Sequence, residues 1–198
     1  MPDPTTLRAL SGMPSAAASL ADSTLIMIDC QNTYTEGVME LAGVQAALDE
    51  AAVLLDRARS AGIPVIHIQH DAGEGSPYDV RAPIGAIVDR VAPRDGEPVI
   101  VKNFPNAFVQ TDLGEHLAAG SAHNLILAGF MTHMCVNSTA RGAFNLGYAP
   151  TVVAAATATR DLPGPDGTVH ASALQAASLA AVGDMFAIVV PDNAAIPA

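Results

Sequence analysis

The sequence predicts an α/β fold in which helices cover both faces of a central, mostly parallel sheet. Apolar, strand-like runs alternate with segments of helical periodicity along most of the chain. A chain in which strands and helices alternate forms right-handed crossover connections between parallel strands. The strand-like runs are continuously apolar, as strands covered on both faces are. With 198 residues, of which half are hydrophobic and 15% are charged, we expect a single domain over residues 1–198 with a full-sized core.

The predicted elements follow one another in a regular order. Apolar runs predict six strands, at residues 23–30, 63–71, 98–104 and 124–130, within residues 149–161, and at residues 185–191. Helical periodicity predicts helices at residues 43–62, 111–122, 136–147 and 168–184. Gly62 suits a helix C-terminus, because glycine readily adopts the left-handed backbone found there. Thr111 is the expected N-cap of the second helix.

Two segments lie outside this alternation. Residues 1–22 are interpreted as an N-terminal arm rather than a signal peptide, because no basic cluster opens them and Pro and Ser interrupt the apolar residues. Residues 71–97 form the longest stretch without clear periodicity. Long irregular segments of compact domains usually serve a site, so we expect a lid or a loop at the edge of a pocket.

Composition narrows the classes of partner. The net charge of −11 argues against nucleic acid and anionic membrane surfaces, and no apolar run approaches the roughly 18–20 residues that a membrane span needs. The two cysteines form no CxxC or Cys/His zinc spacing. This pattern favours a reducing compartment, and we expect a cytoplasmic protein. The Ala-rich, weakly charged surface favours burial in a homo-oligomer.

Reactive side chains are expected at the carboxyl ends of the strands, where open parallel sheets bind their ligands. Asp29 ends the first strand, Lys102 ends the third, and Cys135 follows the fourth. An acid, an amine and a thiol would therefore converge from three strands. An unpaired charge at the end of an apolar run is costly, and pairing Asp29 with Lys102 would remove that cost for both.

This combination suits nucleophilic catalysis. A thiol with a pKa of about 8.5 is only slightly ionised at neutral pH. A helix N-terminus together with Lys102 would stabilise the thiolate of Cys135. Asp29 could accept the thiol proton and later deliver it to a leaving amine. Backbone N–H groups at the turn before the helix could form an oxyanion hole. Cysteine is also among the most buried residue types, so a structural Cys135 is the alternative.

Three blocks of sequence resemble the motifs of the isochorismatase-like cysteine hydrolase superfamily. They read "LIMIDCQNTY", "VIVKNFPNAFVQTDL" and "LILAGFMTHMCVNSTARGAFNLGYAPTVVAAATATRD", in that order, and the likeness extends from about residue 23 to residue 190. The resemblance implies a Rossmann-like, three-layer α/β/α fold. It also implies an Asp–Lys–Cys triad, here Asp29, Lys102 and Cys135. A cis peptide between Phe130 and Met131 is implied, with the N–H groups of Met131 and Cys135 facing the oxyanion.

Members that resemble this chain cleave C–N bonds of amides, ureides and carbamoyl compounds through a cysteine thioester. The substrate pocket is expected to contain Gln31, Tyr34, His70, Phe104, Phe108 and Thr132. One branch of the superfamily holds a metal ion after the second strand, where this chain has His67, His70 and Asp71. The two histidines are three apart on a strand and would point to opposite faces. We therefore predict neither a metal site nor a cofactor.

Two other functions stay open. True isochorismatases cleave a vinyl ether, for which the resemblance implies that the cysteine is dispensable; the presence of Cys135 favours amide-type hydrolysis instead. A non-catalytic or redox-sensing thiol protein on the same fold is the third hypothesis. The expected partner is a small-molecule substrate, and the acidic net charge suits a neutral or cationic amide.

Overall fold

The computed structural model describes residues 4–198, and its centre is a six-stranded sheet in which every neighbouring pair is parallel. The strand order is β3-β2-β1-β4-β5-β8. The bounds are β1 Ser23–Ile28, β2 Val65–His70, β3 Val99–Lys102, β4 Asn124–Phe130, β5 Ala149–Ala158 and β8 Ile188–Val190. The predicted α/β fold with a six-stranded parallel sheet is confirmed.

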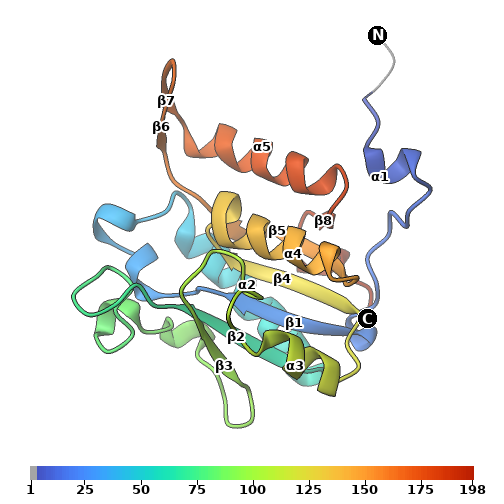
Figure 1. The fold of residues 1–198 in the computed structure, drawn as a ribbon, viewed down its shortest axis with the longest axis horizontal. Helices are drawn as coiled ribbons and strands as arrows, with labels where there is room; N and C mark the ends of the chain where they lie inside the picture. Colours follow the sequence, from blue (N-terminus) through green and yellow to red (C-terminus); the bar gives the residue numbers. More distant parts are fainter. Residues whose placement is uncertain (1–3) are drawn as a thin grey trace.

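Helices cover both faces of this sheet (Figure 1). The α-helices are α1 Leu7–Leu10, α2 Val44–Ala61, α3 Leu113–Ala119, α4 Asn137–Asn145 and α5 Ala171–Gly183. Short 3-10 turns lie at Leu20–Asp22, Asn32–Tyr34, Gly37–Met39, Pro83–Gly85, Asp89–Val91 and Asn193–Ala195.

Alternate residues of the strands feed two separate apolar cores. Leu25 and Met27 of β1 pack in the core that α2 covers. Ile26 and Ile28 of the same strand pack in the core beneath α3, α4 and the end of α5. All six residues of β1 are buried, which explains the continuously apolar strand sequences. The sheet therefore lies between two helical layers, and loops at one of its ends carry the site.

The first or last residues of several helices and strands differ from those predicted from the sequence. Thr111 is not the N-cap of α3; that position is Asp112, whose side chain makes no capping hydrogen bond. Thr111 lies in the turn that precedes the helix, where its hydroxyl donates to the Ala107 carbonyl at 2.5 Å and accepts from the Leu113 N–H at 3.4 Å. Gly62 does end α2, with a left-handed φ of 68°. The last strand is shorter than expected and spans only Ile188–Val190.

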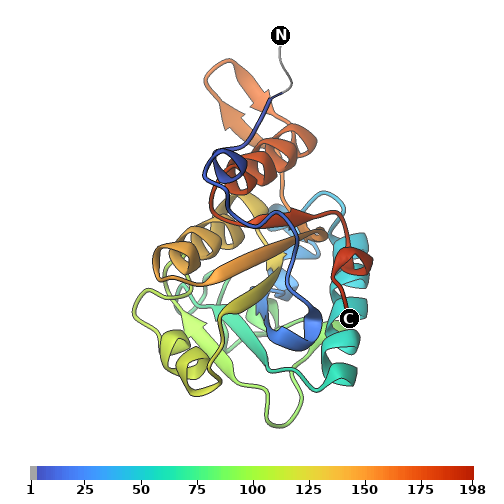
Figure 2. The ribbon, with the colours of Figure 1, turned by 90° about the vertical axis from the view of Figure 1, so that its right-hand side faces the viewer.

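A β-hairpin that the sequence prediction lacked precedes α5. Its strands, β6 Leu162–Gly164 and β7 Gly167–Val169, pair antiparallel and turn at Pro165 and Asp166. Proline and aspartate favour such turns, and Gly167 adopts a φ of 119°. The hairpin extends from the body of the molecule beyond α5 (Figure 2). Because these residues form a hairpin, α5 begins at Ala171 rather than at residue 168.

The N-terminal residues pack against the C-terminal part of the chain. The backbone N–H groups of Leu7 and Arg8 both donate to Asp184, which follows α5. The N–H of Leu20 donates to the Pro197 carbonyl at 2.8 Å. None of the helices in the described part of the chain is long and apolar enough to cross a membrane.

Candidate active site

Asp29, Lys102 and Cys135 lie together at the carboxyl ends of their strands. Lys102 Nζ is 2.7 Å from Asp29 Oδ2 and 3.4 Å from Cys135 Sγ. The three residues are 0%, 1% and 5% exposed. An acid, a cation and a thiol thus share one buried site, as the pattern of strand ends predicts.

The end of β1 aims the Asp29 carboxylate. Asp29 has a left-handed φ of 48°, which is uncommon for a residue other than glycine and marks local backbone strain. Its N–H donates to the Ile68 carbonyl of β2 at 2.9 Å, which holds the strained residue in place. Lys102 comes from β3, two strands away in the sheet. Its long side chain crosses the end of β2 to reach the acid, and it is the only lysine in the chain.

The Lys102 ammonium fixes the protonation state of His70. Its Nζ contacts Asp29, Cys135 and, at 3.1 Å, His70 Nδ1. An ammonium has three N–H donors and no acceptor, so Nδ1 of His70 must accept and the imidazole proton must lie on Nε2. Burial and then the positive charge of Lys102 lower the pKa of His70, which agrees with a neutral imidazole. The predicted pocket residue His70 therefore contacts the lysine directly.

Burial places Cys135 in the thiol form, contrary to the thiolate that the sequence suggests. Burial and then the negative charge of Asp29 raise the pKa of Cys135 to about 12, although Lys102 acts in the opposite direction. Burial also raises the pKa of Asp29, again against Lys102. Apart from the contact of Oδ2 with the Lys102 ammonium at 2.7 Å, neither oxygen of Asp29 accepts a hydrogen bond from residues 4–198. The carboxylate beside the thiol is consequently free to take its proton.

The turn that carries Cys135 is helical from Thr132 onward. Thr132–Val136 form a single π-helical turn that continues into α4, so Cys135 lies inside this turn and not in front of a helix. The Val136 N–H donates to the Met131 carbonyl at 3.2 Å, an i to i+5 bond. The peptide between Phe130 and Met131 is cis, as the resemblance implies. The second cysteine, Cys30, packs in the core on the α2 side of the sheet, as expected.

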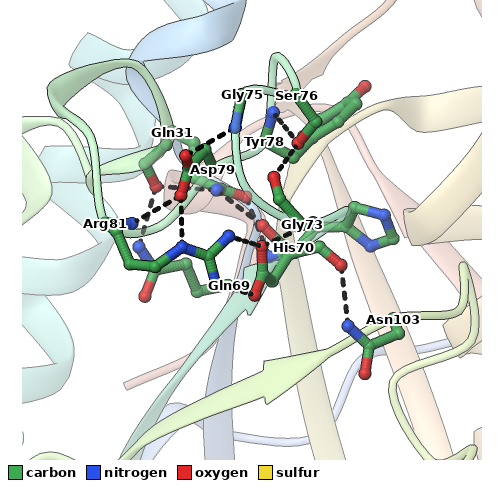
Figure 3. A network of polar contacts seen from close by, with 12 residues as sticks. Gln31, Gln69, His70, Gly73, Gly75, Ser76, Tyr78, Asp79, Arg81 and Asn103 are labelled. Carbon is green, nitrogen blue, oxygen red and sulfur yellow. Dashed lines mark hydrogen bonds and ion pairs between the residues drawn. The ribbon is translucent and has the colours of Figure 1, made fainter.

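Gln31 ties the strand ends to the loop of residues 71–97. Its side-chain amide donates to the carbonyls of His70, at 2.9 Å, and Gly85, at 2.7 Å. Its carbonyl oxygen accepts from the His70 N–H at 2.9 Å. Gln31 is fully buried, and Figure 3 shows it in this network. The side chain thus orders the ends of β1 and β2 next to the triad.

The loop of residues 71–97 is held by its own polar network. The Arg81 guanidinium pairs with both Asp71 and Asp79, and the two carboxylates accept the N–H groups of Gly73 and Gly75 (Figure 3). These hydrogen bonds lower the pKa of Asp71 and of Asp79. The loop is therefore ordered where it borders the site.

This loop brings Tyr78 to the site, a residue that the sequence analysis missed. The Tyr78 ring lies edge-on to His70, with centroids 5.0 Å apart. Its hydroxyl is 3.3 Å from that of Tyr34, and the Tyr34 ring packs on Phe130. A lone aromatic residue in a long loop after the second strand was the available signal.

The other predicted pocket residues lie in different surroundings. Thr132 is 2% exposed, and its hydroxyl has no hydrogen-bond partner within residues 4–198. Phe104 is 42% exposed, next to Lys102 in sequence. Phe108 stacks on Tyr148 and packs against the core beneath α3 and α4. Tyr34, the other predicted aromatic residue, packs edge-on against Tyr78, with ring centroids 5.8 Å apart.

The two histidines of β2 have different partners. His67 Nε2 bonds to Glu97 at 3.0 Å, whereas His70 contacts Lys102. Asp71 is engaged by Arg81. In the part of the chain that the structure describes, no group of three His, Cys, Asp or Glu side chains is placed to hold a metal ion.

Comparison with known proteins agrees with this geometry. The sequence model of the family described as "Isochorismatase domain" matches residues 23–192. A secreted isochorismatase effector of Verticillium dahliae is 33% identical over 184 residues, 92% of this chain and 95% of that protein. A ureidoacrylate amidohydrolase of Stutzerimonas stutzeri is 29% identical over 177 residues, covering 71% of each. The crystal structure of an isochorismatase from Pseudomonas putida KT2440 superposes with a TM-score of 0.94 at 39% identity, covering 98% of this chain and 99% of that one. This chain therefore belongs to the isochorismatase-like cysteine hydrolase family.

Proposed function

We propose that this protein hydrolyses a C–N bond of a small amide, ureide or carbamoyl compound, with Cys135 as the nucleophile. The observation that carries the proposal is the buried cluster in which one ammonium, Lys102, contacts both the Asp29 carboxylate and the Cys135 thiol. A mechanism that required only the acid Asp29 would not require the contact between the Lys102 ammonium and the Cys135 sulfur. A similar protein named as an amidohydrolase supports the same chemistry.

The reaction would proceed in two balanced stages. Cys135 Sγ attacks the carbonyl carbon while its proton passes to Asp29, and the C–N bond breaks as Asp29 returns that proton to the leaving amine. A water molecule then attacks the thioester and gives its proton to Asp29. The C–S bond breaks, the proton returns to the sulfur, and a carboxylic acid leaves. Lys102 stays charged throughout and holds the acid and the thiol together.

The backbone around Cys135 would stabilise the oxyanion. The N–H groups of Met131 and Cys135 are the proposed donors, in line with the resemblance. The unpartnered hydroxyl of Thr132 adds a polar group that a bound substrate can satisfy, since a buried polar atom without a partner is costly. Phe104 and Phe108 stay proposed pocket residues at its outer side.

A second candidate is hydrolysis of a vinyl ether such as isochorismate. The specific observation in its favour is the raised pKa of Asp29, which suits an acid that protonates a carbon–carbon double bond. Similar proteins named as isochorismatases support it as well. In that reaction Asp29 is essential and Cys135 is dispensable, which separates the two candidates.

The test compares purified wild-type protein with Cys135→Ala, Cys135→Ser and Asp29→Asn on a panel of primary amides, ureides and isochorismate. We expect release of ammonia from an amide or ureide, loss of turnover in both Cys135→Ala and Asp29→Asn, and an acyl-enzyme adduct on Cys135 by mass spectrometry. Amide turnover retained in Cys135→Ala would refute the nucleophile. Turnover of isochorismate alone would establish the second candidate, and a reactive thiol without any turnover would favour a redox-sensing protein.

We further propose a cytoplasmic homo-oligomer. The outer face of α5 supports assembly, because its exposed residues between 173 and 181 are alanines that leave room for close packing. Light scattering coupled to size exclusion tests this, with a dimer or tetramer expected and a monomer at micromolar concentration as the contrary result. A fusion of the full chain to a fluorescent protein tests the compartment.

A further inference from the structure

Arg160 lies at the same edge of the sheet as the nucleophile. It follows β5 by two residues, and β5 is the neighbour of β4 on the side away from β1. Ala158 of β5 pairs with Phe130 of β4, directly before the turn that carries Cys135. Thr159, adjacent to Arg160, bonds to His133 of that turn at 2.6 Å. Arg160 therefore flanks Cys135 from one side as Asp29 does from the other.

The Arg160 guanidinium has no protein partner within residues 4–198, although the chain is strongly acidic. Its Nε is buried and makes no hydrogen bond. The chain has 20 Asp and Glu residues against nine Lys and Arg residues. The side chain of each of the other seven arginines makes a hydrogen bond or an ion pair: Arg8, Arg57, Arg59, Arg81, Arg90, Arg94 and Arg141. Burying part of a guanidinium without a hydrogen-bond or ion-pair partner costs free energy, and a bound ligand with an acceptor group would remove that cost.

The nearest acid in sequence is occupied elsewhere. Asp161 accepts the Ala171 N–H at 2.7 Å and contacts His170 Nδ1 at 3.1 Å, both at the start of α5. Arg160 instead exerts its positive charge on the site. It lowers the pKa of His133 in the nucleophile turn, where burial is the larger cause. It also acts on Tyr78, the loop residue that touches His70. The charge of Arg160 thus acts on both the nucleophile turn and the loop, in keeping with its place at this edge of the sheet.

We propose that Arg160 binds a carboxylate of the substrate, so that the enzyme acts on amides or ureides that carry a negative charge. This inference rests on the proposed C–N hydrolase activity. A guanidinium presents paired N–H donors whose geometry matches a carboxylate. The reacting carbonyl would lie at Cys135 and the carboxylate at Arg160. The overall acidity of the chain, which by itself favours a neutral or cationic substrate, is overridden by this local charge.

The first test compares two matched probes, succinamate, which carries a carboxylate, and succinamide, which is neutral. We expect wild-type protein to prefer succinamate, and Arg160→Gln to lose about ten- to a hundred-fold in kcat/KM for succinamate through KM, with little change for succinamide. Arg160→Lys should recover part of the loss. Arg94→Gln removes the same charge at an exposed ion pair and serves as the control. Equal losses on both probes, or none, would overturn the proposal.

The second test does not need turnover. Iodoacetate and iodoacetamide differ mainly by charge, and their rates of alkylation of Cys135 can be read by mass spectrometry at that residue. The ratio of the iodoacetate rate to the iodoacetamide rate should fall several-fold in Arg160→Gln and stay unchanged in Arg94→Gln. A fall in this ratio without amide turnover would keep the anion site and refute the hydrolase. Amide turnover with an unchanged ratio and no preference for succinamate would refute the anion site alone.

Discussion

Removing Lys102 should expose how strongly the buried triad depends on its single cation. The Lys102 ammonium and the Asp29 carboxylate are 2.7 Å apart, and both side chains are 0% exposed. Lys102→Met keeps the length and apolar stem of the side chain but deletes the charge. Asp29 is then left in the core beside a thiol, with no cation within contact distance among the described residues.

The expected loss follows from burial and charge. Two unit charges at this separation attract by about 6 kcal/mol at an effective dielectric constant of about 20, but much of this is offset by the cost of removing both ions from water. Breaking a buried pair by deleting one partner typically costs about 3–5 kcal/mol. We expect a loss of that size at pH 8. Burial already raises the pKa of Asp29 in the presence of Lys102, and without the cation it rises further.

The stability of Lys102→Met should change with pH in a direction that follows from the raised pKa of Asp29. An acid whose folded-state pKa is raised contributes stability below its unfolded pKa and loses it as pH rises through the folded value. Lys102→Met should therefore be more stable at pH 5 than at pH 8. In the double variant Asp29→Asn with Lys102→Met, no buried carboxylate remains at this site, so this difference should vanish and part of the stability should return.

Urea unfolding followed by far-UV circular dichroism measures these free energies, which suits a chain without tryptophan. The double variant also guards against the case in which Lys102→Met fails to fold at pH 8. A loss below about 1 kcal/mol for Lys102→Met, or equal stability at pH 5 and pH 8, would refute the description of Asp29 as a buried carboxylate held by one ammonium.

Three further predictions concern the thiol, a buried ion pair and a glycine. Iodoacetamide alkylation of Cys135 should rise with pH toward about 12; a midpoint below 8.5 would contradict the protonated thiol. Glu97→Gln should cost about 1–3 kcal/mol at pH 7, because Arg59 lowers the pKa of Glu97 to about 2. The stability given by Glu97 is present above its unfolded pKa and is lost as pH falls, so wild type and variant should converge near pH 2 in urea titrations; a constant gap would contradict this. Gly129→Ala should cost about 3 kcal/mol or more, because its Cβ would lie 1.9 Å from the Ile28 carbonyl oxygen at a φ of +116°. Gly114→Ala in open space on α3 is the matched control, and equal melting temperatures for the two variants would refute the steric argument.

The triad could be placed from the sequence because Asp29 and Lys102 end apolar runs and Cys135 lies in the turn that follows another. A charge after a buried strand has to lie at the sheet edge, and parallel strands put those edges together. The parallel topology alone is enough to predict that Asp29 and Lys102 lie close together. Gln31 follows the same logic, since a buried amide beside the triad must find partners and does so at His70 and Gly85.

Other features depended on contacts that no local pattern reveals. The approach of Tyr78 to His70 results from the return path of a long loop, which is fixed by the pairing of Arg81 with Asp71 and Asp79. The hairpin before α5 is short and exposed, so it carries no apolar alternation. The thiolate expected at Cys135 disagrees with the burial that raises the pKa of this thiol, because the extent of burial cannot be read from residue types.

Burial of the triad determines where the proton of the Cys135 thiol can go. Raised pKa values for both Asp29 and Cys135 mean that releasing a proton to solvent would leave a second negative charge beside a single ammonium in the core. Passing the proton from the sulfur to Asp29 leaves the net charge of the site unchanged, so that cost does not arise. In the proposed reaction, the nucleophile would then form only when a carbonyl is in place to accept the sulfur. We expect such a thiol to react slowly with soluble electrophiles and, under the proposed function, still to attack a substrate that is bound against the turn of Met131 to Cys135.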